Sequence, residues 1–185
     1  MKKWLLPMAA LAFLVGCQDE TVETPSSEAT GPAGEVETKI EEALGTDVSI
    51  PTMQNHDIGL AYLDSAAEST SAHLIYQTTT KPADGFNVDT WSEQNEYEVL
   101  HGDLFKDAPL AELDIFPETF GELADAEAQE IAGKEVAYKV IPGSVRDTAV
   151  IGFDKDGAGY MITYYLAVNQ TIDEAFNFAE QIIEN

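Results

Sequence analysis

The sequence predicts an α+β domain: an antiparallel β-sheet (meander) packed by a C-terminal helix, with a short N-terminal helix as well. Three runs rich in β-forming residues indicate the sheet, at 135–141, 148–153 and 160–168. The dipeptides Pro142-Gly143 and Asp156-Gly157 separate these runs and are typical of turns. Consecutive strands joined by short turns usually pair with each other, which predicts an antiparallel meander.

Residues 171–185 predict the helix that closes the core. Thr171 and Glu174 have the spacing of a capping box, in which each side chain accepts a backbone hydrogen bond at the helix start. The apolar residues recur every three or four positions and so share one face of the helix: Ile172, Ala175, Phe176, Ala179, Ile182 and Ile183. We expect this face to lie on the sheet.

The earlier elements are a helix and a hairpin. Val36, Ile40 and Leu44 follow helical spacing, and Gly45 stands where a helix would stop. The alternating run 58–63 and the β-rich run 71–79 predict two paired strands with a loose polar connection.

Proline and glycine interrupt the region 80–130 repeatedly, so its periodicity is weak. The run 91–100 fits either a strand or a short helix. Composition predicts helices over 107–113 and 118–128, although neither run has a clear apolar stripe.

The first sixteen residues have the layout of an export signal peptide. Lys2 and Lys3 precede an uninterrupted run of apolar and small residues that reaches Gly16. A membrane-spanning helix needs roughly 20 apolar residues, so this run is short for a span. We interpret residues 1–16 as a targeting segment that is removed from the mature protein.

The end of this segment, Leu14-Val15-Gly16-Cys17, resembles the lipobox of bacterial lipoproteins at all four positions. The resemblance implies that the Cys17 thiol is alkylated with diacylglycerol and that the chain is then cut before it. The alternative is a buried free cysteine, but Cys17 is the only cysteine and stands where the lipobox requires it. The expected partner is therefore membrane lipid, through acylated Cys17, and the expected location is the extracytoplasmic face of the cell membrane.

The remaining chain divides into a tether and one domain. Residues 17–34 come directly after the signal peptide and are rich in Glu, Thr, Ser, Pro and Gly. They contain too little apolar surface to fold, so we expect a disordered acidic tether. Residues 35–185 are long enough for a single α+β domain. A lone cysteine excludes an intramolecular disulfide, so stability must come from the apolar core.

The mature chain is strongly acidic. Without Lys2 and Lys3 it has 7 basic and 34 acidic residues, a formal charge of −27. This charge repels nucleic acid and anionic lipid head groups, so we expect no nucleic-acid partner. It favours solubility, cations and basic partners, although acidic surfaces also occur on many outward-facing proteins without any dedicated cation site.

The C-terminal order of elements also resembles a known type of domain. Residues 131–138 (IAGKEVAY), the turn at Asp156-Gly157, the run 160–162 and the final helix fit an uncharacterised domain of membrane-anchored and lipid-anchored proteins of Gram-positive bacteria. Ile50-Pro51 and residues 74–76 fit the same outline, so the resemblance spans about residues 36–184. It implies a fold and a location, and it brings no catalytic residues.

Two groups of residues are weak candidates for metal ligands. Asp154 and Asp156 begin like a calcium loop, but an EF-hand would need glutamate where Tyr165 stands, and an Asp-Gly pair is also the chemistry of a hairpin turn. The histidines His56, His73 and His101 lack the close His or Cys neighbour typical of zinc sites, and nothing brings His56 to His101. We therefore predict no metal site, and a hairpin at Asp156-Gly157.

The tyrosines of the last predicted strand are weak candidates for ligand binding. Successive strand residues point to opposite faces, so Tyr164 and Tyr165 must diverge, and one of them faces away from the closing helix. Such a side chain, or Tyr160, either lines a ligand groove or packs across strands; cross-strand packing is the interpretation we favour.

No catalytic motif is evident. None of the serines lies in a Gly-x-Ser-x-Gly elbow, and the sequence has no glycine-rich phosphate loop. Closely spaced carboxylates are expected by chance in so acidic a chain and so do not indicate a glycosidase-type site. We therefore predict no catalytic residues and no cofactor. The leading hypothesis is a non-enzymatic lipoprotein that binds a protein or envelope component at the cell envelope. The alternatives are an envelope hydrolase using acidic residues and an extracytoplasmic cation-binding or cation-sensing protein.

Overall fold

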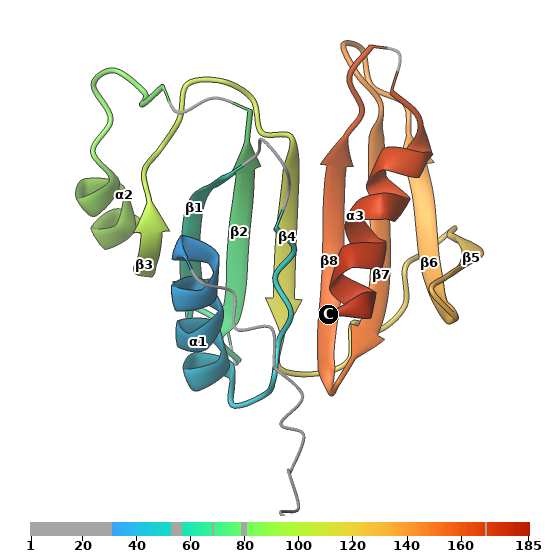
Figure 1. Ribbon diagram of the computed structural model, residues 1–185. Helices are drawn as coiled ribbons and strands as arrows, with labels where there is room; N and C mark the ends of the chain where they lie inside the picture. The colour runs from blue at the N-terminus through green and yellow to red at the C-terminus, as the bar shows by residue number, and fades with distance from the viewer. Residues whose placement is uncertain (1–30, 53–56, 68, 79–80, 169) are drawn as a thin grey trace, which may run out of the picture.

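The computed structural model describes residues 31–52, 57–67, 69–78, 81–168 and 170–185 (Figure 1). These residues form three α-helices and eight β-strands. In chain order the elements are α1 (Pro32–Leu44), β1 (Asp57–Asp64), β2 (Ser71–Gln77), α2 (Val88–Asn95), β3 (Tyr97–Gly102), β4 (Ala111–Phe116), β5 (Glu127–Ile131), β6 (Lys134–Ile141), β7 (Thr148–Lys155), β8 (Ala158–Tyr165) and α3 (Ile172–Glu184).

The strands make one antiparallel sheet in the order β3-β1-β2-β4-β8-β7-β6-β5. The predicted meander is confirmed and is extended by β5, so that β5 to β8 pair in sequence order. The predicted hairpin is confirmed as β1 and β2. β4 pairs with β8, with Leu113 opposite Ile162, and this ladder joins the two halves of the chain into a single sheet (Figure 1).

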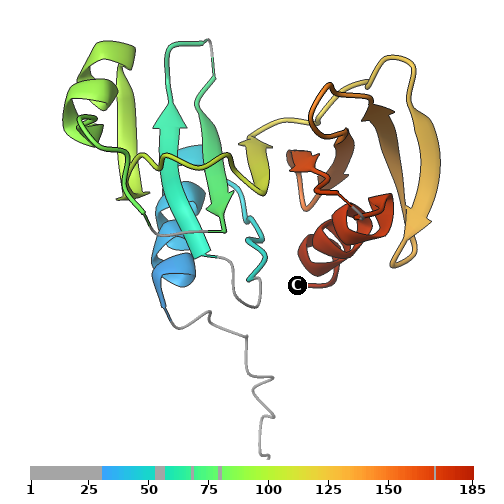
Figure 2. The same cartoon turned by 90° about the horizontal axis from the view of Figure 1, so that it is seen from above.

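Helices α1 and α3 lie on the same face of the sheet, and α2 lies on the other (Figure 2). Val36 and Ile40 of α1 and Phe178 and Ile182 of α3 are fully buried in the core beneath them. The predicted closing helix is confirmed: α3 begins at Thr171 with the complete capping box, and its apolar face packs on the sheet.

Strand alternation gives the sheet a core face and an outer face. On β4, Ala111, Leu113 and Ile115 are fully buried, whereas Glu112 and Asp114 point to the opposite side. We call this opposite side, which α1 and α3 do not cover, the outer face. The register places on it several half-buried polar and aromatic side chains: Tyr62, Ser71, His73, Glu112, Asp114, Thr163 and Tyr165.

The region 80–130 differs from the sequence prediction. The run 91–100 contains both alternatives, because α2 ends at Asn95, Glu96 adopts a left-handed conformation, and β3 begins at Tyr97. The helices predicted over 107–113 and 118–128 are wrong: residues 107–110 and 118–126 form turns, bends and loop, and the remaining residues of the two ranges belong to β4 and β5. Buried and half-buried residues alternate along β4, which is the pattern of a strand with one face on the core. β5 lies at the edge of the sheet, where it pairs with β6.

The N-terminal boundary of the domain also moves. The short predicted helix is confirmed, but α1 begins at Pro32, inside the range 17–34 assigned to the tether. Proline is favoured in the first turn because its φ is already helical and its missing N–H is not needed there. The helix therefore begins three residues before the predicted domain boundary, and residues 17–30 of the predicted tether lie outside the described residues.

A small polar network ties α3 to the segment that follows α1. The Lys155 ammonium donates to the Ser49 hydroxyl at 2.7 Å and to the Ile182 carbonyl at 2.8 Å, near the C-terminal end of α3. The Glu37 carboxylate accepts from the Ile50 backbone N–H at 2.9 Å. Burial lowers the pKa of Lys155 and raises the pKa of Glu37, so both groups are part of the packed structure.

Candidate functional site

The three candidate tyrosines of β8 lie on different faces. The ring of Tyr160 is fully buried, stacks on Phe153 at 5.3 Å, and its hydroxyl accepts from the Ser49 N–H; burial raises its pKa to about 12. Tyr164 is buried against Phe178 of α3. Tyr160 and Tyr164 therefore pack in the core, and of the three only Tyr165 is on the outer face.

Tyr165 belongs to a polar row on the outer face. Its hydroxyl donates to the Glu112 carboxylate at 2.8 Å, and the Arg146 guanidinium lies over its ring at 4.1 Å. Burial, together with the bond to Glu112, raises the pKa of Tyr165 to about 12. The row thus links β4, β8 and the loop between β6 and β7.

The candidate aspartates do not converge. Asp156 lies in the β7–β8 turn with a φ of 51°, next to Gly157 at 92°, and two positive φ values are the pattern of a two-residue hairpin turn. The Asp154 carboxylate accepts from the Phe120 backbone N–H, while the Asp156 carboxylate is 64% exposed. Among the described residues, no group of three or more His, Cys, Asp and Glu is placed to hold a metal ion.

One histidine has a well-defined pair of partners. The His73 Nδ1 atom lies 2.6 Å from the Asp114 carboxylate oxygen, and its Nε2 atom lies 3.0 Å from the Ser71 hydroxyl. Neighbouring strands position these side chains, because His73 is directly opposite Asp114 in the β2–β4 ladder and Ser71 is two residues before it on the same face. His101 is on β3, and His56 lies outside the described residues.

An aromatic cluster flanks the hydrogen-bonded row formed by Ser71, His73 and Asp114. The His73 imidazole stacks on the Tyr62 ring with centroids 4.9 Å apart and an interplanar angle of 15°. Tyr62 in turn contacts Trp91 of α2 edge-on at 5.2 Å and Tyr97 of β3 at 4.7 Å. Burial is the main cause that raises the pKa of Tyr62, which stays a neutral phenol. The cluster fixes the imidazole plane from one side.

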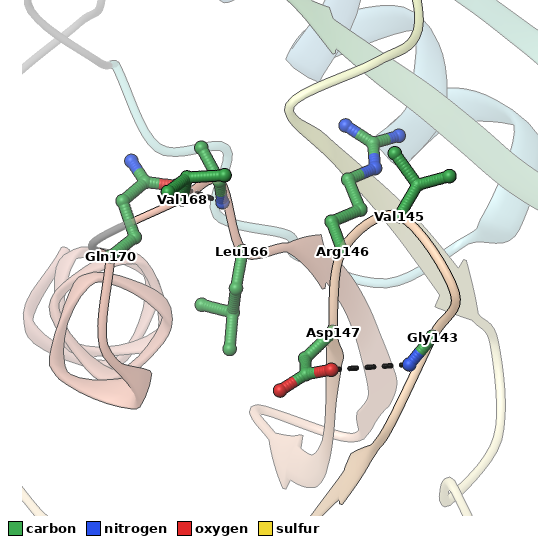
Figure 3. A pocket seen from close by; sticks show the side chains of 8 residues that line it. Gly143, Val145, Arg146, Asp147, Leu166, Val168 and Gln170 are labelled. Atoms are coloured by element: carbon green, nitrogen blue, oxygen red, sulfur yellow. Dashed lines mark hydrogen bonds between the residues drawn. The ribbon is translucent and has the colours of Figure 1, made fainter.

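A shallow hollow of about 270 Å³ opens at one end of the sheet, between the β6–β7 loop and the β8–α3 loop (Figure 3). Val145 and Val168 stand on its two sides with exposed fractions of 87% and 83%, and buried Leu166 lies between them. Arg146, the only arginine of the chain, also lines the hollow and donates to the Pro109 carbonyl. The Gly143 N–H donates to the Asp147 carboxylate, which holds the β6–β7 loop in shape (Figure 3).

The predicted lipobox residues Leu14, Val15, Gly16 and Cys17 lie outside the described residues. Within the described ranges, none of the helices is both long and apolar enough to cross a membrane.

Sequence reasoning missed both the Ser71–His73–Asp114 row and the hollow. His73 and Asp114 are 41 residues apart, and the range 107–113 was expected to be helical, which leaves no ladder to bring the two together. The alternation of apolar and acidic residues from Ala111 to Phe116 was the available signal for that strand.

Comparison with known proteins found no match to this chain among protein-family models, curated proteins or solved structures. The resemblance to a Gram-positive membrane-anchored domain therefore stays a prediction.

Proposed function

We propose that this protein is a lipid-anchored extracytoplasmic binding protein with an accessory role at the bacterial cell envelope. The observation that carries the proposal is the segment Leu14-Val15-Gly16-Cys17, which directly follows two lysines and an apolar run. A signal peptide that ends in this way directs export and lipid attachment together. Two acyl chains on one residue give stable anchoring, whereas one chain alone gives only marginal membrane affinity.

The distance between anchor and domain supports this role. Pro32, the first residue of α1, follows Cys17 by 15 positions. At roughly 3.3–3.6 Å for each extended residue, such a segment reaches at most about 54 Å. The domain thus stays near the membrane but has room to turn, and its charge of −27 keeps it off anionic head groups.

The hollow at the loop end is the surface that best fits a binding role. Val145 and Val168 are among the most exposed large apolar side chains of the described residues, and both line the hollow. Burial of these two apolar side chains on binding would be favourable, so they suit contact with an apolar group. The fitting partner is a protein or envelope component that offers an apolar group to this hollow.

Replacing Cys17 with serine is expected to abolish lipid attachment, because the hydroxyl is a poorer nucleophile than the thiol. The variant should leave the membrane fraction and fail to incorporate a clickable fatty acid in cells. A matched control places the thiol elsewhere, as Cys17→Ser combined with Ser26→Cys, and should also stay unlabelled because it lacks the lipobox context. Labelling of Cys17→Ser at the level of the unaltered chain would contradict the anchor.

A photoreactive residue at Val145 is expected to crosslink a partner in intact cells, while the same residue at exposed Glu42 of α1 should not. Adding Val168→Asp should reduce the Val145 crosslink at least several-fold, since a carboxylate at the rim opposes burial of an apolar group. The readout is the shift of the full lipidated chain on a gel. Equal crosslinking from positions 145 and 42, or none from position 145, would exclude the hollow as the binding surface.

A further inference from the structure

The row formed by Ser71, His73 and Asp114 has the hydrogen-bond order of an activated serine. A carboxylate only accepts hydrogen bonds, so the proton of a neutral His73 imidazole must be on Nδ1, 2.6 Å from Asp114. The Nε2 atom then has its lone pair free to accept from the Ser71 hydroxyl, 3.0 Å away. The proton acceptor, its orienting carboxylate and the nucleophile are all in place.

The surroundings hold this geometry while leaving it accessible. Stacking against Tyr62 limits rotation of the imidazole, and the β2–β4 ladder fixes Asp114 opposite His73. The side chains of His73 and Asp114 remain 22% and 18% exposed, and Ser71 is also half-buried rather than enclosed. The row therefore lies on the outer face and is not enclosed in the core.

We propose that Ser71 is a nucleophile that cleaves neutral carboxylic esters, an activity beyond the binding role and independent of the lipid anchor. The Ser71 oxygen attacks the ester carbonyl carbon and its proton passes to His73 Nε2. The carbon–oxygen bond to the alcohol then breaks, and the alcohol leaves with that proton. Water attacks the acyl-serine by the same route, which releases the carboxylic acid and restores Ser71.

The neighbouring residues set the class of ester. Asp64 pairs with Ser71 across the β1–β2 ladder, and Glu112 is next to Asp114 on the same face, so negatively charged substrates are repelled. Ser71 sits on an interior strand, where backbone N–H groups are used in ladders rather than free to stabilise an oxyanion. The best substrates are hence uncharged short-chain esters with good leaving groups, such as aryl esters.

The test treats the purified full chain with a fluorophosphonate probe and separately with p-nitrophenyl acetate. Mass spectrometry is expected to find the phosphonyl adduct on Ser71, and Ser71→Ala should abolish both labelling and hydrolysis. His73→Gln should slow labelling about 100-fold because the general base is lost. Asp114→Asn should slow it by about tenfold or more, because the imidazole tautomer is no longer fixed.

Ser65→Ala is the matched control, since its hydroxyl pairs with Thr70 rather than with a histidine, and its labelling rate should equal that of the unaltered chain. Thermal unfolding of each variant separates loss of reactivity from loss of fold. The proposal is overturned if no adduct forms on Ser71. It is equally overturned if folded His73→Gln labels Ser71 at the unaltered rate, which would reduce the row to a structural hydrogen-bond chain.

Discussion

Replacing Phe178 with alanine is expected to lower the free energy of unfolding by about 3–5 kcal/mol, the cost of emptying a fully buried aromatic site. Phe178 is the point where α3 meets the sheet: its ring is 0% exposed and meets Tyr76 edge-on at 5.0 Å. It also contacts Tyr164 at 6.2 Å, so two aromatic rings, those of Tyr76 and Tyr164, lose a neighbour at once. Urea unfolding of the full chain, followed by tryptophan fluorescence, measures the loss.

Phe86→Ala is the matched control for this prediction. Phe86 is 69% exposed, so the same atoms are removed without opening a cavity, and the change should stay within about 0.5 kcal/mol. Similar losses for Phe178→Ala and Phe86→Ala would mean that α3 does not close the core in solution.

Gly102→Ala is expected to cost roughly 2–5 kcal/mol, for two reasons that act together. Gly102 ends β3 with a φ of 86°, a conformation that side chains disfavour by about 1–2 kcal/mol. A Cβ atom there would also lie 1.8 Å from the Gly59 carbonyl oxygen of β1, so the paired strands would have to separate. The same urea unfolding curve reports this loss.

Gly121→Ala separates the cost of the left-handed backbone conformation from the cost of the steric clash. Gly121 has nearly the same φ, 87°, but nothing lies within 4 Å of the added Cβ, so only the backbone term of about 1–2 kcal/mol applies. An equal loss for both variants would show that β3 and β1 are not in close contact at Gly59.

The elements with strong local signals were predictable from the sequence. The meander and α3 are specified by β-rich runs, by turn dipeptides and by a capping box, and each of these signals acts within a few residues. The alternation that separates Tyr164 from Tyr165 also follows from local geometry, and the two side chains do lie on opposite faces.

The elements of the middle region were less predictable because tertiary pairing decides them. β5, with the sequence Glu-Ala-Gln-Glu-Ile, consists mainly of helix-forming residues, and it is a strand because β6 offers a partner at the sheet edge. β4 joins the two halves of the sheet, so its partners are 35 or more residues away in sequence. No short window of sequence contains that information.

The same cause explains why the candidate sites were only partly foreseen. The anchor is a contiguous motif and needs no fold to be recognised, whereas the Ser71–His73–Asp114 row exists only once β2 and β4 are paired. The hollow likewise needs two loops, from 142–147 and 166–171, to meet at one end of the sheet. Sequence thus predicts where the protein is held, and the fold supplies the surfaces with which it can act.

The most direct test of the proposed anchor is the mass of the N-terminal peptide of the protein purified from its own membranes. The account predicts a peptide that begins at Cys17 and carries a diacylglycerol group on the thiol, with residues 1–16 absent. A peptide that begins at Met1, or one in which Cys17 is present as an unmodified thiol, would contradict it.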